Sequence, residues 1–164
     1  MKTRAAFFAL LVGLDTHAKE LSRVHRHNLA AWSRIQLGEI NIVDWGALGF
    51  TLHRLYGILE NYFLRVSEFF DPPLPSADWH RDLVERMSVD IATVRPALIT
   101  TVEMGAHALE LLAFRQYIRN LCGEKMDKVR TADVQRWAWD FYLKFETVHA
   151  EFTDRLRTIA EQLP

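Results

Sequence analysis

The feature that most constrains the fold is an apolar stripe in the segment 44–70. Its members follow one another in alternating steps of three and four residues: Trp45, Leu48, Leu52, Leu55, Leu59, Tyr62, Val66 and Phe69. Such steps place side chains on one face of an α-helix, because the helix repeats every 3.6 residues. At ~1.5 Å per residue this helix would be about 40 Å long. The stripe therefore predicts a long helix packed against other helices.

The same spacing predicts four further helices. They cover the first thirty-odd residues, Trp79 to Ile91, Thr100 to about Asn120, and Thr131 to Leu163. The N-caps predicted for the last three are Ser76 or Asp78, Thr100 and Thr131. The segment Asp71-Pro-Pro-Leu-Pro75 is the clearest break between helices.

These elements predict an all-α fold, an antiparallel bundle of about five helices in one domain over residues 1–164. The helix over 44–70 is predicted to be the longest. No segment alternates apolar and polar residues between turn signals, so no strand is expected.

Composition narrows the class of protein. The formal net charge is −1, and no basic stripe typical of a non-specific nucleic-acid coat is visible. The single cysteine, Cys122, excludes an internal disulfide framework and a Cys-rich zinc site, so a cytoplasmic location is expected. The apolar run Ala5–Leu14 is shorter than a membrane span and lacks a cleavage site after it. We expect it to begin the first helix, with no membrane association.

Histidines and carboxylates do not form a familiar metal motif. His25 and His27 would lie about 200° apart on a helix, and His53 flanks the apolar stripe. The Glu-x-x-His repeats of helical di-iron sites are absent from the sequence. No metal and no cofactor are therefore expected. Glu60 follows Leu59 directly, which places a carboxylate at the edge of the buried seam.

The densest polar cluster ends the fourth predicted helix. Arg115 and Arg119 lie one turn apart, and Gln116 and Asn120 lie one turn apart on the adjacent face. Two guanidiniums beside two amides can grip a phosphate and contact a sugar or base edge. A solvated helix end, whose arginines offset the helix dipole, has the same pattern. Spacing alone leaves both interpretations open.

Three blocks of the chain, together covering about residues 45–155, resemble the HepT-like branch of the HEPN superfamily of small helical toxin ribonucleases. The first block is 48–61, with its Tyr56…Glu60-Asn61 ending. The second is 72–83 followed by 95–99. The third is 114–123 with Asp127 after it. The resemblance implies an HEPN-like helical bundle.

The active motif of that family is an Arg, a polar residue, a His five positions after the Arg, and often a Tyr two further on. The matching positions here are Arg115, Gln116, Asn120 and Cys122, so the His and Tyr positions both depart from the pattern. The resemblance implies metal-independent cleavage of RNA, in which the 2′-hydroxyl attacks the adjacent phosphate. Asn120 can orient a hydroxyl, but it cannot carry the proton.

The resemblance also implies roles and partners. Arg115 and Asn120 are the expected catalytic residues, and the expected substrate-binding residues are Gln116, Arg119, Glu60 and Asn61. Members of the family pair with nucleotidyltransferase antitoxins, which in some systems modify the motif Tyr, and they commonly dimerise around one cleft. A homodimer is therefore expected, and Phe69 and Phe70 offer apolar surface for it.

The primary prediction is thus a HepT-like toxin-type endoribonuclease domain. The alternative is a catalytically inactive HEPN domain that binds RNA or a nucleotidyltransferase antitoxin. A structural helical adaptor is a third class. Cleavage of RNA without metal separates the first from the other two, and binding without cleavage separates the second from the third.

Overall fold

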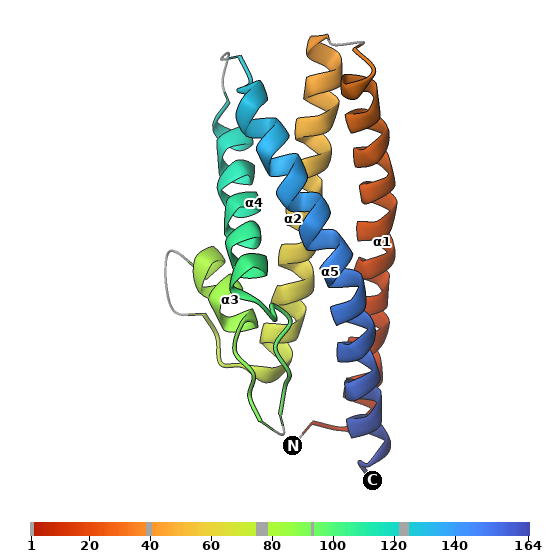
Figure 1. The fold of residues 1–164 in the computed structure, drawn as a ribbon. Coiled ribbons are helices and arrows are strands. Elements are labelled where there is room, and N and C mark those ends of the chain that lie inside the picture. The colour runs from red at the N-terminus through yellow and green to blue at the C-terminus, as the bar shows by residue number, and fades with distance from the viewer. Residues whose placement is uncertain (1, 39–40, 75–78, 93, 122–124) are drawn as a thin grey trace.

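The structure is a computed structural model, and it describes residues 2–38, 41–74, 79–92, 94–121 and 125–164. Four long helices form an up-down-up-down bundle, and one short helix packs on its outside (Figure 1). The helices are α1 (Arg4–Gln36), α2 (Ile42–Phe70), α3 (Trp79–Met87), α4 (Val102–Asn120) and α5 (Lys128–Glu161). The predicted all-α bundle of five helices is confirmed, and the described residues contain no strand.

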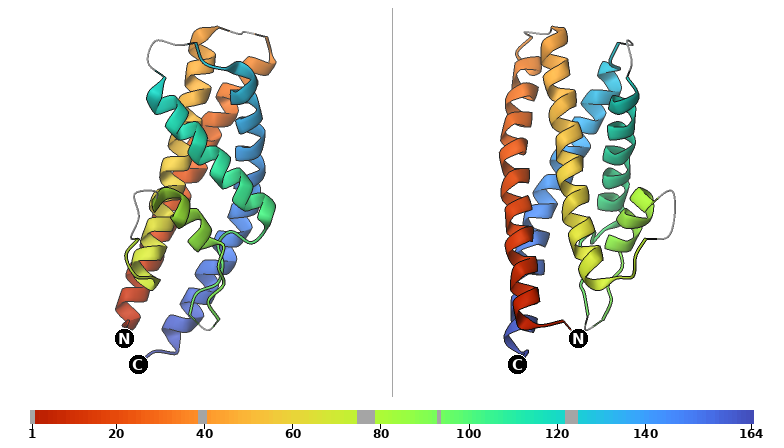
Figure 2. Two further views of the ribbon diagram at one scale, coloured as in Figure 1. Left: turned by 90° about the vertical axis from the view of Figure 1, so that its left-hand side faces the viewer. Right: turned by 180° about the vertical axis from the view of Figure 1, so that it is seen from behind.

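Neighbours in the bundle follow the order of the chain. α1 packs against α2 and α5, and α4 packs against the other faces of α2 and α5. The short helix α3 contacts only α2 and α4 among the described elements, as the turned views in Figure 2 show. The place where α2, α3 and α4 meet is therefore built from segments far apart in the sequence.

Local sequence explains where the helices begin. The side chain of Asn41 accepts hydrogen bonds from the backbone of Val43 and Asp44, and the Asp44 carboxylate accepts one from the Asn41 backbone. This reciprocal capping box satisfies N–H groups at the start of α2 that lack intrahelical partners. Proline at 72 and 73 prevents α2 from continuing past Asp71.

Two of the observed N-caps differ from the predicted residues. The N-cap of α4 is Thr101 rather than Thr100, because its hydroxyl accepts the Met104 backbone N–H. The N-cap of α5 is Asp127, and Thr131 lies one turn inside the helix, where its hydroxyl donates to the Asp127 carbonyl. The predicted caps of α3, Ser76 and Asp78, lie outside the described residues.

The third helix is shorter than predicted. It ends at Met87, and Ile91 instead forms a backbone bridge with Arg95. The backbone N–H groups of Leu98 and Ile99 both donate to the Met87 carbonyl. Because the returning chain satisfies this helix end, the helix does not need to continue to Ile91.

The prediction that the second helix is the longest is wrong. α5 has 34 residues and α1 has 33, compared with 29 in α2. The apolar pattern of α2 is the most regular, but α5 contains neither glycine nor proline and so continues further. Every residue of the apolar run Ala5–Leu14 lies within α1, as predicted. Within the described residues, no helix is long and apolar enough to cross a membrane.

The aromatic residues proposed for a dimer contact are used inside the protomer. Phe7 packs edge-on against Phe69 and Phe70, with ring centroids 5.0 and 6.1 Å apart. Both rings at the end of α2 are half-buried in this cluster. They hold the start of α1 against the end of α2, so only part of each ring remains available for a contact with another protomer.

The lowered pKa values of three histidines predict how the stability of the protein depends on pH. Burial lowers the pKa of His25, His53 and His149 below the ordinary value of ~6.5. The unfolded chain therefore binds protons at these sites before the folded chain does, so stability falls as the pH falls below ~7. We expect urea midpoints measured from pH 8 to pH 5 to decline, and His25→Phe, which keeps the ring stack on Tyr142, to decline less steeply. An equal slope for the two proteins would contradict this prediction.

Candidate functional site

A buried carboxylate joins α2, α3 and α4. Glu60 of α2 is 5% exposed. Its Oε2 accepts a hydrogen bond from Arg115 Nη1 of α4 at 3.0 Å and lies 2.6 Å from His80 Nδ1 of α3. One oxygen atom thus holds a guanidinium and an imidazole from two other helices. The sequence predicts Glu60 at the edge of the buried apolar stripe, but it does not predict the contacts of Glu60 with Arg115 and His80.

The Arg115 side chain is largely shielded from solvent. Its guanidinium carbon lies 5.8 Å from the centroid of the Tyr56 ring, which is fully buried one turn before Glu60. Burial, followed by the nearby Glu60 charge, raises the pKa of the Tyr56 hydroxyl, so this group stays protonated. Arg115 Nε is buried and has no hydrogen-bond partner among the described residues. Because this nitrogen is closed off from solvent, a ligand can reach only the exposed 18% of the Arg115 side chain.

His80 is fixed on two sides. Glu60 binds its Nδ1, and the indole of Trp79 stacks on the imidazole with centroids 3.7 Å apart and planes 29° apart. The side chain keeps a quarter of its surface exposed. A carboxylate on Nδ1 favours the tautomer with its proton on that nitrogen, which leaves the Nε2 lone pair available.

A surface cavity of about 300 Å³ opens beside these groups between α3 and α4. It is lined by His80, Arg81, Leu109, Leu112, Ala113 and Gln116. The polar members are an imidazole, a guanidinium and an amide, and the others form an apolar wall. This combination suits a ligand with a phosphate and a flat or sugar-like part.

A second histidine approaches Arg115 from another direction. Burial lowers the pKa of His53 on α2, and the positive charges of Arg115 and Arg119 lower it further. His53 therefore lies near both arginines and stays neutral at pH 7. Its Nδ1 is buried and has no hydrogen bond among the described residues.

The structure separates the predicted site residues into two groups. Glu60 and Arg115 are brought together by a direct bond, and Gln116 lines the adjacent cavity. Arg119, Asn120 and Asn61 are exposed. The sequence predicts these three as site residues, and none of them lines the cavity between α3 and α4.

Asn120 is the last residue of α4. Because α4 is a regular helix up to that point, five residues turn Asn120 about 140° away from Arg115 around the helix axis. Cys122, at the position of the family tyrosine, lies outside the described residues. The groups beside Glu60 are thus Arg115 and His80, and Asn120 faces elsewhere.

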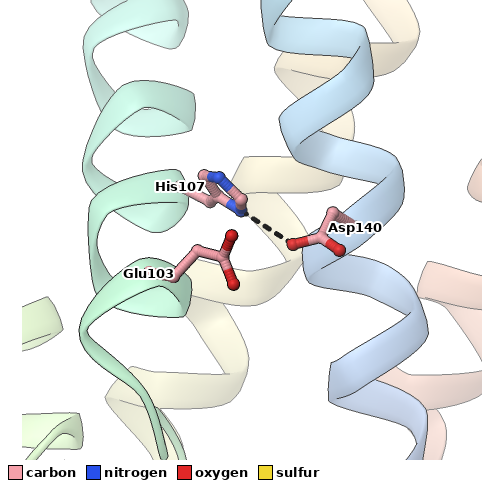
Figure 3. Close-up of side chains that lie close together, drawn as sticks. All are labelled: Glu103, His107 and Asp140. Atoms are coloured by element: carbon pink, nitrogen blue, oxygen red, sulfur yellow. Dashed lines mark ion pairs between the residues drawn. The ribbon is translucent and has the colours of Figure 1, made fainter.

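A second polar cluster has metal-ligand geometry. Glu103 and His107 lie one turn apart on α4 and face Asp140 of α5 (Figure 3), and one ligand atom of each lies within 4.8 Å of the others. His107 Nδ1 is 3.1 Å from Asp140 Oδ2, a contact that does not meet hydrogen-bond geometry. Lys144 Nζ lies 2.6 Å from Glu103 Oε2 and 2.9 Å from Asp140 Oδ2. An ammonium thus already neutralises both carboxylates, and a metal ion would have to displace it.

Sequence reasoning missed His80 and the Glu103–His107 pair. His80 was part of the second resemblance block, but no periodicity or motif singled it out. Its role depends on α3 packing across α2 and α4, which no local pattern encodes. The Glu-x-x-x-His spacing of the second cluster was a signal available in the sequence.

Comparison with known proteins shows the family of the chain. A family model described as HepT-like protein matches residues 47–156, which contain Glu60, His80 and Arg115. No curated protein and no solved structure matches the chain. The matched region covers α3, α4 and most of α2 and α5. The chain belongs to the HepT-like protein family.

Proposed function

We propose that this protein is a toxin-type domain that cleaves RNA without a metal ion. The observation that carries the proposal is the position of Arg115, which donates to buried Glu60, the residue whose other partner, His80, lines the cavity between α3 and α4. In such a reaction the ribose 2′-hydroxyl attacks the adjacent phosphorus atom and the P–O5′ bond breaks. Negative charge grows on the phosphate oxygens in the transition state, and the guanidinium stabilises it.

The remaining groups around the cavity support binding of a nucleotide. Gln116 offers a donor and an acceptor to a sugar or base edge, and Arg119 lies one turn further along α4. Asn120 and Asn61 are exposed and can contact RNA beyond the cavity. Arg115 is the residue we expect to act on the reacting phosphate.

Cleavage of a mixed RNA in EDTA tests the proposal. We expect products with 2′,3′-cyclic phosphate and 5′-hydroxyl ends, because the 2′-oxygen is the nucleophile. The same sequence made of DNA is expected to stay intact, since it lacks that oxygen. Cleavage that requires added metal, or equal cleavage of DNA, would contradict the mechanism. RNA binding without cleavage would favour the alternative, an inactive domain that binds RNA or a nucleotidyltransferase antitoxin.

We also propose a homodimer and a nucleotidyltransferase-type antitoxin as partners, as the family resemblance implies. Phe50 supports a contact near the site, because it is 60% exposed on α2 one turn before His53. A dimer across this surface would bring two copies of the 115–120 segment towards one groove.

Light scattering tests the dimer. At tens of micromolar we expect a dimer for the natural protein and a monomer for Phe50→Glu, because the new carboxylate would be buried in the contact. Val12→Glu is the matched control, since Val12 is 68% exposed on α1 and should leave the dimer intact. A monomeric natural protein, or dissociation by both substitutions alike, would count against the proposed contact.

A further inference from the structure

The proton carrier of the family motif is missing from its expected place. Asn120 occupies the His position, and the regular α4 helix turns it away from Arg115. An amide cannot accept a proton from a hydroxyl near neutral pH. If the domain cleaves RNA, another group near Arg115 has to remove the proton of the 2′-hydroxyl.

We propose that His80 is this catalytic residue, and that the cavity between α3 and α4 receives the ribose and phosphate of the cleaved nucleotide in a single-stranded RNA. The inference rests on the proposed ribonuclease function. His80 and Arg115 share the Glu60 Oε2 atom, so a phosphate near the guanidinium also lies near the imidazole. His80 lines the cavity together with Arg81 and Gln116.

Glu60 prepares His80 for the role of a general base. The carboxylate binds Nδ1 at 2.6 Å, which holds the proton on that nitrogen and leaves Nε2 as the acceptor. The stacked Trp79 ring fixes the imidazole plane. A base held in one tautomer and one orientation does not have to reorganise when the reaction begins.

The proposed reaction returns His80 to the protonation state in which it starts. His80 Nε2 takes the proton of the 2′-hydroxyl while the 2′-oxygen forms a bond to phosphorus and the P–O5′ bond breaks. The leaving 5′-oxygen takes a proton from a water molecule in the cavity, which is open to solvent. The hydroxide that remains is neutralised by the proton on His80, so the imidazole returns to its neutral form.

Charges around His80 come from three helices. Glu60 faces it from α2 and Arg115 from α4, and Arg81 follows it on α3. No other helix packs against α3 in the described part of the chain, and Arg95 of the returning segment donates to the Arg86 carbonyl at the far end of α3. A carboxylate and two guanidiniums are therefore the charged groups around His80.

The deciding variant is His80→Asn. The Asn Nδ2 takes the place of the imidazole Nδ1 and can still donate to Glu60, but the variant has nothing in place of Nε2. We expect single-turnover cleavage of RNA in EDTA to fall by about 100- to 10,000-fold. The rise of the natural rate with pH between about 5 and 8 should disappear, because histidine is the side chain that changes charge there. Thermal unfolding of the two proteins should remain similar.

Two further variants distinguish a loss of catalysis from a loss of folded structure. His80→Ala should regain part of its activity when millimolar imidazole is added, because the open cavity admits the free base. His27→Gln, on the exposed face of α1, should cleave like the natural protein. An effect of His80→Asn on folding alone would lower the unfolding temperature and would not respond to imidazole in His80→Ala.

The outcomes separate this inference from the proposed function. If the natural protein does not cleave RNA, both are overturned. If the natural protein cleaves and His80→Asn stays within threefold of it with the same pH profile, only the role of His80 is overturned. The same conclusion follows if His53→Gln loses activity and His80→Asn does not, because the histidine near Arg119 would then carry the proton.

Discussion

Replacement of Arg115 by alanine is expected to lower the rate of RNA cleavage by about 10²- to 10³-fold. The guanidinium is always charged and presents several donors in a fixed plane, so it matches the charge that develops on the phosphate. Its Nη1 donates to Glu60, which fixes the position of the guanidinium, and 18% of the side chain remains exposed to a ligand. The measurement is the single-turnover rate in EDTA at saturating RNA.

Controls separate the loss of charge stabilisation from a loss of structure. Arg115→Lys keeps the positive charge beside Glu60, so its stability should stay close to that of the natural protein while its rate falls because the forked donors are gone. Arg157→Ala removes an exposed arginine of α5 and should leave the rate unchanged. Asn120→Ala should lose less than Arg115→Ala, since a neutral amide stabilises anionic charge less. An unaffected rate for Arg115→Ala would show that the active site lies elsewhere.

Replacement of Glu60 by glutamine is expected to reduce both stability and activity. The carboxylate is 5% exposed and accepts from Arg115 and His80 with the same oxygen, whereas a glutamine offers one uncharged acceptor oxygen and turns an NH2 donor towards the other donors. We expect the free energy of unfolding to fall by about 2–3 kcal/mol. This is less than the ~3–5 kcal/mol typical of a fully buried pair, because 18% of the Arg115 side chain and 25% of the His80 side chain remain in contact with solvent.

Urea unfolding measures the stability change, and the cleavage assay measures the activity. Glu68→Gln is the matched control, because Glu68 lies on the same helix and is exposed. It should change the unfolding free energy by less than ~0.5 kcal/mol. A Glu60→Gln protein as stable as this control would show that the carboxylate does not hold the three helices together. Normal cleavage by the same protein would show that it does not position Arg115 and His80.

Much of the fold could be predicted from the sequence, because each helix buries a stripe that repeats at the helical period. Trp45 to Val66 lie in the core as the stripe of α2 predicted, and prolines 72 and 73 follow the end of that helix. Cap positions were less certain: adjacent Thr100 and Thr101 can both serve, and only the bond to the Met104 N–H selects Thr101. Ile91 was assigned to a helix because its spacing fits, but backbone bonds from a later segment end that helix at Met87.

The sequence by itself predicted Arg115, Gln116 and Glu60 as site residues, since a polar cluster on a helix end and a carboxylate beside an apolar stripe are visible in the linear pattern. Only the tertiary structure decided that Glu60 bonds Arg115, which is 55 residues away, and that His80 joins them from α3. It also decided that Asn120 points away from this group. The physical reason is that helical periodicity fixes which face of a helix is buried, whereas the packing of α3 across α2 and α4 fixes which polar side chains meet.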